Sequence, residues 1–388
     1  MDQRLIALVV GFALAGVACQ TNPPAESGGK VRDSAGVTLV DNDGPDRAAP
    51  WRLEPIATIG GADTGVENFG RLDYSTVGAD TLGHVYIVNE AEGHVVVFDS
   101  AGRYVRTIGR KGGGPGEIQG VGSMFVEPSG GVAIQDYGKM ALVRLGFDGG
   151  TKPDTPITRL LGLLYGVIRF EGDTLLLHSQ GELTPNPPEK LLAITRADTT
   201  TLASLVRIPP NGELNACDRY RMRGLPRIFA PQMNWTAGGG SVVVNTTAAY
   251  EVDIHRANRL VRRIRRNVAL IPATTEMIRR LYPAGRMYGG KECIVSADQI
   301  ERDVGAADVV PAIQGVALDQ EGRLWVGRYT FPDEPSRTDL FSATGGYLGT
   351  FSGIGTPLGF PARGLVVTAS VDSATDVGRL VVNRLIKR

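Results

Sequence analysis

The sequence lacks net charge, a cluster of histidines and a recognisable catalytic arrangement. It contains 41 Lys and Arg residues against 41 Asp and Glu residues, so no global field attracts nucleic acid, and we expect no nucleic-acid partner. No Ser/His/Asp or Cys/His arrangement can be singled out from spacing, which gives no support to a catalytic set. The histidines lack the close spacing that metal sites often show, and they are His84, His94, His178 and His255.

The N-terminus has the pattern of an export signal. Arg4 precedes an apolar run, Leu5–Ala18, which is too short to span a bilayer stably. The run ends in Gly-Val-Ala before Cys19 and resembles the bacterial lipobox, although Gly16 stands where Leu is usual. We expect residues 1–18 to be a cleaved signal peptide and Cys19 to carry lipid. The alternative is an ordinary secretory signal with an unmodified cysteine.

A flexible segment is predicted to follow the lipid. Residues 19–35 are rich in Pro, Ser and Gly without apolar periodicity, which is typical of a linker. We therefore expect the folded part, residues 36–388, to lie in the bacterial cell envelope, lipid-anchored and facing the periplasm or the cell exterior.

A repeat of strands and turns runs along the chain. The 51 glycines and 23 prolines are spread between short Val, Ile and Leu runs, which indicates an all-β fold. Three copies begin at Leu82, Gly130 and Asp319, and weaker copies begin at Gly172 and Gly239. Four antiparallel strands that recur at roughly 40 to 50 residues are typical of a propeller blade.

A sixth blade is predicted from both ends of the chain. Gly364–Val367 and Arg379–Val382 would supply its C-terminal strands, and Val37–Val40 and Trp51–Ile59 its N-terminal ones. This closure removes an open sheet edge that would otherwise invite aggregation. The sequence therefore predicts one all-β domain, a six-bladed β-propeller of four-stranded antiparallel blades.

One junction between repeats resembles a known family. Residues 108–118, Ile-Gly-Arg-Lys-Gly-Gly-Gly-Pro-Gly-Glu-Ile, resemble the loop between blades of NHL-repeat propellers, and Ser352–Leu358 is a degenerate relative. The loop lacks the Gly-Lys-Ser/Thr ending of a phosphate-binding loop, so we interpret it as a turn between blades. The resemblance implies an NHL-like six-bladed propeller lipoprotein, but it leaves function open because one fold hosts many functions.

Two long stretches depart from the blade period. They are Pro209–Pro231 and Pro272–Pro311, and the second predicts two short helices near Thr274–Tyr282 and Ser296–Arg302. Strands hidden in the second stretch would make seven blades, but its pattern is helical. Long insertions in a propeller lie over one face, commonly the face that binds a partner.

Each of these insertions carries one cysteine, Cys217 or Cys293, in a compartment that permits disulfides. We expect a Cys217–Cys293 bond with a structural role. The alternative is two separate, half-buried thiols.

The basic run Arg262–Arg266 is interpreted as an outer edge strand in which charge prevents edge-to-edge pairing, and the alternative is a site for an anionic ligand.

Polar residues follow the second strand of several repeats, where the opening of the central channel is expected. They are polar where a blade core would stay apolar, which favours a ligand site. The candidate ligand-binding residues are Asn89, Glu90, Asp136, Tyr137, Gln180, Arg328 and Tyr329. An equally open interpretation is that they are turn residues that cap strand ends.

The predicted function is a membrane-tethered binding or interaction scaffold rather than an enzyme. Its expected partner is an envelope protein, a peptide or a glycan, and we expect a monomer that contacts the membrane through its lipid. No cofactor is expected in this case. The alternative is a metal-dependent hydrolase or lyase, lactonase-like, with Ca²⁺ or Zn²⁺ in the central channel, as the resemblance to other six-bladed folds implies.

Overall fold

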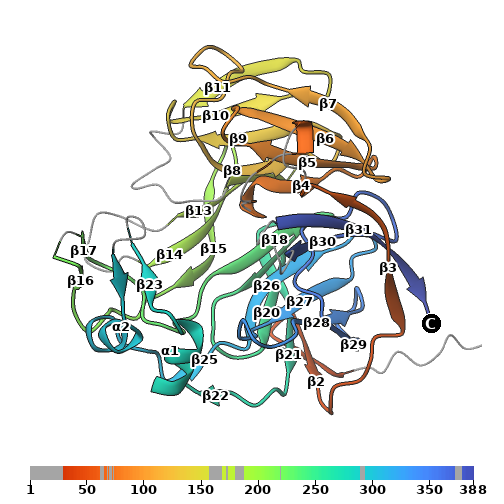
Figure 1. Ribbon diagram of the computed structural model, residues 1–388. Helices are drawn as coiled ribbons and strands as arrows, with labels where there is room; N and C mark the ends of the chain where they lie inside the picture. The colour runs from red at the N-terminus through yellow and green to blue at the C-terminus, as the bar shows by residue number, and fades with distance from the viewer. Residues whose placement is uncertain are drawn as a thin grey trace, which may run out of the picture.

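The described chain folds mainly into short strands grouped in small sheets (Figure 1), and some of these strands are buried on both faces. The computed structural model describes residues 29–61, 65–67, 69, 72, 74–156, 168–171, 174–179, 188–218, 220–288, 293–371 and 378–388. Strands β5 (His84–Asn89) and β6 (His94–Asp99) each contain four consecutive buried residues. Because neighbouring residues of a strand point to opposite faces, such runs need packing on both sides of their sheet.

Five blades each contain four antiparallel strands that follow one another in chain order. Blade 1 contains β4 (Val77–Ala79), β5, β6 and β7 (Tyr104–Ile108), and the short 3-10 helices η1 (Gly65–Glu67) and η2 (Tyr74–Thr76) precede it. Blade 2 contains β8 (Val121–Val126), β9 (Val132–Asp136), β10 (Ala141–Leu145) and β11 (Thr151–Pro156), and blade 3 contains β12 (Ile168–Glu171), β13 (Thr174–Ser179), β14 (Glu189–Ile194) and β15 (Thr199–Leu205). Blade 4 contains β18 (Asn234–Gly238), β19 (Ser241–Asn245), β20 (Glu251–Arg256) and β21 (Arg259–Arg266), and blade 5 contains β26 (Ile313–Leu318), β27 (Leu324–Arg328), β28 (Arg337–Phe341) and β29 (Tyr347–Ser352).

The sixth blade joins the two ends of the described chain. Its strands are β30 (Leu365–Val371), β31 (Gly378–Lys387) and β3 (Trp51–Ile59), and β3 pairs with β31 in antiparallel register. At its inner edge the fourth strand is reduced to a bridge between Gly359 and Val367. The predicted six-bladed fold and its closure by Trp51–Ile59 are confirmed.

Apolar clusters fill the junctions between neighbouring blades. Val85 and Val367 belong to the cluster between blades 1 and 6, while Trp325 and Val366 belong to the one between blades 5 and 6. Comparable clusters fill the other junctions of the ring. Since apolar burial contributes about 25 cal/mol per Å², the blades stabilise one another mainly across these junctions.

A buried aspartate organises the first turn of two blades. Asp80 Oδ1 accepts the backbone amides of Leu82 and His84 at 2.9 and 2.8 Å, and its Oδ2 accepts the Tyr86 hydroxyl at 2.9 Å. Asp319 is placed in the same way in blade 5, where its Oδ2 accepts the indole N–H of Trp325 at 3.0 Å. The aspartate, the glycine turn and the aromatic residue therefore form one unit in these blades.

The position of the first N-terminal strands differs from the prediction. Strand β2 (Val37–Asn42) does not join the closing blade but pairs in parallel with β21, with Val40 opposite Ile264. Both side chains are 1% exposed and pack in the cluster between blades 4 and 5. Strand β1 (Lys30–Ser34) pairs with β2, so sheet structure begins within the segment expected to be a linker.

Strand β21 is consequently not an edge strand, which corrects the interpretation of Arg262–Arg266. Two of its arginines pair with acidic residues of β20 instead. Arg263 Nε lies 2.6 Å from Asp253, and Arg265 Nε lies 2.6 Å from Glu251. Arg263 and Arg265 therefore form cross-strand ion pairs between β21 and β20, while β2 pairs with the opposite edge of β21.

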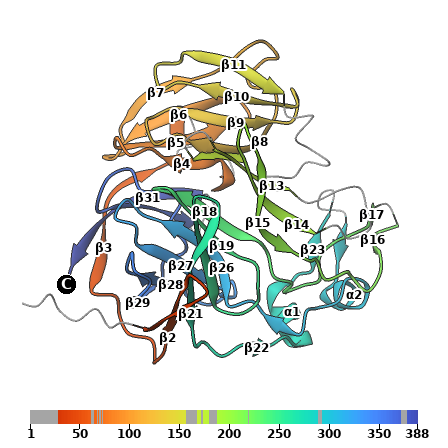
Figure 2. The ribbon, with the colours of Figure 1, turned by 180° about the vertical axis from the view of Figure 1, so that it is seen from behind.

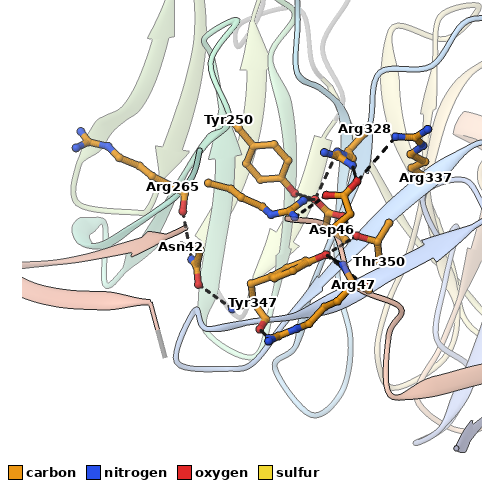
Figure 3. A network of polar contacts seen from close by, with 11 residues as sticks. Asn42, Asp46, Arg47, Tyr250, Arg265, Arg328, Arg337, Tyr347 and Thr350 are labelled. Atoms are coloured by element: carbon orange, nitrogen blue, oxygen red, sulfur yellow. Dashed lines mark hydrogen bonds and ion pairs between the residues drawn. The ribbon is translucent and has the colours of Figure 1, made fainter. Parts of the chain in front are cut away.

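A buried ion-pair network joins blades 4 and 5 (Figure 3). Arg266 and Asp339 have side chains that are 2% and 0% exposed, and their charged atoms lie 2.7 Å apart. Asp46, on the link between β2 and β3, lies 2.6 Å from Arg266 and 2.6 Å from Arg328. The Tyr250 hydroxyl donates to Asp339 at 2.8 Å. The link from the N-terminus is thereby tied to both blades.

Aromatic and hydroxyl contacts complete this network. The Arg266 guanidinium lies 3.9 Å from the centre of the Tyr347 ring, and the Thr350 hydroxyl donates to Asp339 at 2.6 Å. Burial acts to raise the pKa of Asp46, but the Arg328 and Arg266 guanidiniums outweigh it and hold that pKa below its usual range. The Asp46 carboxylate is therefore kept charged at neutral pH.

The two insertions fold together into one unit, here called the insertion module, residues 209–231 and 272–311. Its elements are β16 (Leu214–Ala216), β17 (Tyr220–Met222), β22 (Ile271–Pro272), α1 (Thr275–Leu281), β23 (Arg286–Met287), β24 (Ile294–Val295), α2 (Ala297–Asp303) and β25 (Val309–Val310). The predicted helical insertion is confirmed, with Thr274 and Ser296 as N-caps. Within the described residues, neither α-helix is long and apolar enough to cross a membrane.

A disulfide and an apolar core hold the insertion module together. The predicted Cys217–Cys293 bond is confirmed, with a Cα–Cα distance of 5.7 Å. Cys293 packs among Leu214, Ile278 and Ile300 in a cluster separate from the blade junctions. A backbone hydrogen bond also joins the two insertions: the Ile228 amide donates to the Gly305 carbonyl at 2.9 Å.

Removal of the disulfide is expected to destabilise the insertion module. The bond closes a sequence separation of 76 residues, so C217S/C293S should lower the free energy of unfolding by about 2–4 kcal/mol. Urea unfolding with and without reductant measures this. Reductant should shift the wild-type midpoint and leave the double variant unchanged. Equal midpoints for the oxidised wild type and the variant would contradict a stabilising bond.

Neutralising the buried network should cost far more than neutralising a partly exposed pair. D339N removes the buried counter-charge of Arg266 and leaves it only the partly exposed Asp46, and we expect a loss of about 3–5 kcal/mol in urea unfolding. The matched control is D253N, whose partner Arg263 is partly exposed, with an expected loss of about 0–1 kcal/mol. Equal losses of unfolding free energy in the two variants would show that Asp339 is not essential to the contact between blades 4 and 5.

Candidate functional site

The insertions and the second-strand ends lie on one face of the ring. In an antiparallel four-stranded blade, the turn after the second strand and the link to the next blade leave from the same side. Residues 209–231 link β15 to β18, and residues 272–311 link β21 to β26. Figures 1 and 2 show α1, α2, β16 and β23 gathered together next to blade 3. The prediction that the insertions cover one face agrees with this arrangement.

A cavity of about 310 Å³, here called the insertion pocket, lies between the insertion module and the inner strands of blades 4 and 5. This volume falls within the usual range for small-molecule sites, roughly 300–1,000 Å³. Its apolar wall contains Ile228, Phe229, Leu281, Ile300, Val304 and Ile313. Its polar lining residues are Arg227, Gln232, Asn234, Tyr282, Arg286, Tyr288, Gln314 and Tyr329.

Tyr329 connects blade 5 to the pocket. It follows the end of β27, and its amide donates to the Ala312 carbonyl at 3.1 Å. Its ring packs edge-on against Phe229 and Phe331 at centroid distances of 5.9 and 5.6 Å. Burial raises the pKa of the Tyr329 phenol to about 12, so its hydroxyl stays protonated and able to donate at neutral pH.

Tyr288 contributes a hydroxyl that has no partner. The residue is 8% exposed, and its oxygen meets no hydrogen-bond partner in the part of the chain that the structure describes. Buried hydroxyls are nearly always hydrogen-bonded, and leaving one unpaired costs about 1–3 kcal/mol. An unpaired hydroxyl on a residue that lines a cavity is the strongest single sign of a ligand position in this region.

The insertion pocket adjoins the central channel. A second cavity, of about 360 Å³, is lined by inner-strand residues that include Met124, Trp235 and Val316, and also by His178. Asn234 lines both cavities, and Gln314 and Gly315, neighbours on β26, each line one of them. His178 Nε2 lies 3.0 Å from Glu189 in the channel wall. The insertion pocket therefore lies at the entrance to the central channel.

The described residues hold no group of three or more His, Cys, Asp or Glu side chains placed to bind a metal. His84 Nδ1 lies 2.8 Å from Asp80 within a turn, and His178 pairs with Glu189. Burial lowers the pKa of His94 and of His255. The four histidines thus lie in separate local environments, as their spacing indicated.

Most of the residues predicted around the channel have local roles. Asn89 Oδ1 accepts the Glu92 amide at 3.2 Å, and Glu90 is exposed in the same turn. Asp136 is fully buried and accepts the amides of Gln119 and Lys139 at 2.7 and 3.0 Å. These contacts favour the turn interpretation for Asn89 and Asp136.

Of the remaining predicted residues that the structure describes, one lines the insertion pocket and two lie elsewhere. Tyr137 lies against Gly122 of β8, where an added Cβ would be 2.2 Å from the ring. Arg328 belongs to the network around Asp46, and Tyr329 lines the insertion pocket. Gln180 and Cys19 fall outside the described residues.

Sequence reasoning missed Arg286, Tyr288 and Gln314 as pocket residues. The insertions were identified as the place to look, but nothing in the sequence indicated which face of each short strand turns inward. Two tyrosines that flank an arginine, at 282, 286 and 288, were the available signal. The Arg286 guanidinium in fact lies 6.0 Å from the Tyr282 ring and 5.2 Å from the Tyr288 ring.

Comparisons with known proteins agree on the architecture. Residues 76–157 match DUF5128, a family described as a 6-bladed beta-propeller. No curated protein sequence matches the chain. A Bacteroides fragilis protein classed as exported is 14% identical over 90% of this chain and 100% of its own, with a TM-score of 0.52.

Two further solved structures are more distant. A member of the DUF4221 family from Bacteroides vulgatus is 9% identical over 87% of this chain and 99% of its own, with a TM-score of 0.48. A streptogramin B lyase is 10% identical over 86% of this chain and 98% of its own, with a TM-score of 0.42. Likeness at such low identity concerns the fold alone. What the comparisons establish is that this chain is a six-bladed β-propeller.

Proposed function

We propose that the protein is a lipid-anchored binding protein of the bacterial cell envelope, of NHL-like architecture, that holds its ligand in the insertion pocket. The observation that carries this proposal is the cavity itself, with a buried and unpaired Tyr288 hydroxyl in its wall. Site-forming residues come from blades 4 and 5 and from both insertions. A rigid ring that presents a covered pocket is suited to binding with little loss of conformational entropy.

The placement in the envelope rests on the N-terminal sequence and on the disulfide. Residues 1–18 have the pattern of a signal peptide, and Cys19 follows a lipobox-like sequence. The Cys217–Cys293 bond is the kind of cross-link that persists in exported proteins. The structurally similar Bacteroides fragilis protein is classed as exported, which agrees with this placement.

Binding, rather than chemistry in the channel, is favoured by the character of the pocket. Its described lining contains apolar side chains, phenols, amides and two arginines but no histidine or acidic residue. General acid–base catalysis commonly uses a histidine or carboxylate with a tuned pKa within reach of the substrate. The groups present in the pocket can orient a ligand by hydrogen bonds and apolar contact, which is what a binding site requires.

Blocking the pocket should abolish ligand capture. A library of neutral, cationic and anionic fragments is screened against the purified protein by saturation-transfer NMR. Q314W places an indole at the pocket entrance from an exposed position and should abolish binding of the true ligands. The matched control is E90W, on the same face but outside the pocket. If no fragment binds the wild type in a way that Q314W removes, the proposed site is wrong.

Removing Cys19 should release the protein from the membrane. Acyl chains contribute about 0.8 kcal/mol per buried methylene, so two or three of them hold a protein firmly. In Triton X-114 partitioning, the wild type should enter the detergent phase and C19S the aqueous phase. Wild-type protein in the aqueous phase would instead show an ordinary secretory signal.

A further inference from the structure

We infer that the ligand of the insertion pocket is a small organic acid, with its carboxylate at Arg286 and Tyr288 and its apolar body against the wall of the insertion module. This inference rests on the proposed function, because it specifies the chemical class that the same pocket accepts. It follows from the charges, the hydrogen-bond donors and the apolar surface of the described lining residues.

Arg286 supplies an available positive charge. It is an exposed residue of β23 that lines the insertion pocket, and it forms no ion pair with any carboxylate that the structure describes. The other pocket arginine is already engaged, since Arg227 Nε donates to the Pro209 carbonyl at 2.8 Å. A guanidinium presents its N–H groups in a planar fork that matches a carboxylate. Arg286 is therefore the group that would receive an anion.

Several acidic residues around the insertion module contact partners other than Arg286. Asp298 lies 3.1 Å from Arg279, and Glu301 accepts the Thr275 hydroxyl at 2.6 Å. Asp333 lies 2.6 Å from Arg280. Arg286 forms no such pair among the described residues, so its guanidinium is available to an anionic ligand, whereas a cation would be repelled by it.

Tyr288 adds a hydrogen-bond donor to the same part of the pocket lining. The Arg286 guanidinium lies 5.2 Å from the centre of the Tyr288 ring, so the charge and the tyrosine with the unpaired hydroxyl belong to the same part of the pocket lining. Burial raises the pKa of Tyr288 despite the opposing effect of Arg286, and the phenol stays a donor at neutral pH. A carboxylate accepts such hydrogen bonds with both oxygens, whereas a cation cannot.

The rest of the pocket is suited to an apolar group. Phe229, Leu281, Ile300 and Ile313 line it, and burying such a ligand would displace water from their surfaces. A simple inorganic anion would leave this wall in contact with water. The combination of one charged rim and one apolar wall therefore selects an acid that carries an aromatic or aliphatic body.

The test uses matched acid and amide probes. Isothermal titration of the purified protein with 4-phenylbutyrate, 3-phenylpropionate and 5-phenylvalerate is compared with titration of the corresponding amides. We expect acids to bind at least roughly tenfold more tightly than their amides, since a charge-assisted hydrogen bond is lost in the amide. Equal affinities, or no binding by any of the acids, would overturn the assignment of an acid.

Two variants separate the contributions of the charge and the hydroxyl. R286Q should weaken acid binding by roughly tenfold and leave amide binding unchanged, while R221Q removes an arginine from exposed β17 as a control without effect. Y288F should weaken acid binding without lowering the melting temperature of the free protein, because its hydroxyl has no partner there. A lower melting temperature with unchanged acid affinity would indicate a structural hydroxyl instead.

The outcomes distinguish this inference from the proposed function. If fragments that Q314W displaces prove to be neutral or cationic, the pocket binds a ligand but the acid assignment fails. If Q314W displaces no fragment, both conclusions fail together. Acid binding that is insensitive to both Q314W and R286Q would place the acid elsewhere on the protein and overturn the inference.

Discussion

The antiparallel pairing of β3 with β31 is the interaction on which the rest of the structure depends. Each blade has two buried faces, so none can be stable without a neighbour on both sides. The register that joins Trp51 to Lys387 and Ile59 to Leu380 closes the ring through the two chain ends. Without it, the clusters that flank blade 6 would both be exposed. Closure is therefore a condition for every junction and for the face that carries the pocket.

The closed ring explains how the insertions came to form a pocket. Two consecutive links between blades, on either side of blade 4, emerge on one face and are long enough to meet above it. Their own apolar core and the Cys217–Cys293 bond hold them together as the insertion module. Tyr329 joins the insertion module to blade 5 through its ring contacts with Phe229 and Phe331. The insertion pocket is then the space between the insertion module and the propeller ring, each of which has its own apolar core.

The sequence was sufficient for those features that repeat or that follow local rules. The strands, the closure by Trp51–Ile59 and the capped helices were predictable because apolar runs, turns and caps act over a few residues. The parallel addition of β2 to β21 was not, since it depends on Val40 fitting a junction more than two hundred residues away. Of the predicted site residues, Tyr329 alone of those described lines the insertion pocket. Asn89 and Asp136 instead cap turns, and a polar residue at a strand end gives no sequence signal that separates these roles.

The most direct test of the central claim is hydrogen–deuterium exchange of the purified protein with and without saturating 4-phenylbutyrate. The account predicts slower exchange in residues 225–232, 281–288 and 312–314, which surround the insertion pocket, and unchanged exchange in blades 1 and 2. Protection centred on the turns at Asn89 and Asp136, with none in the insertion module, would contradict it.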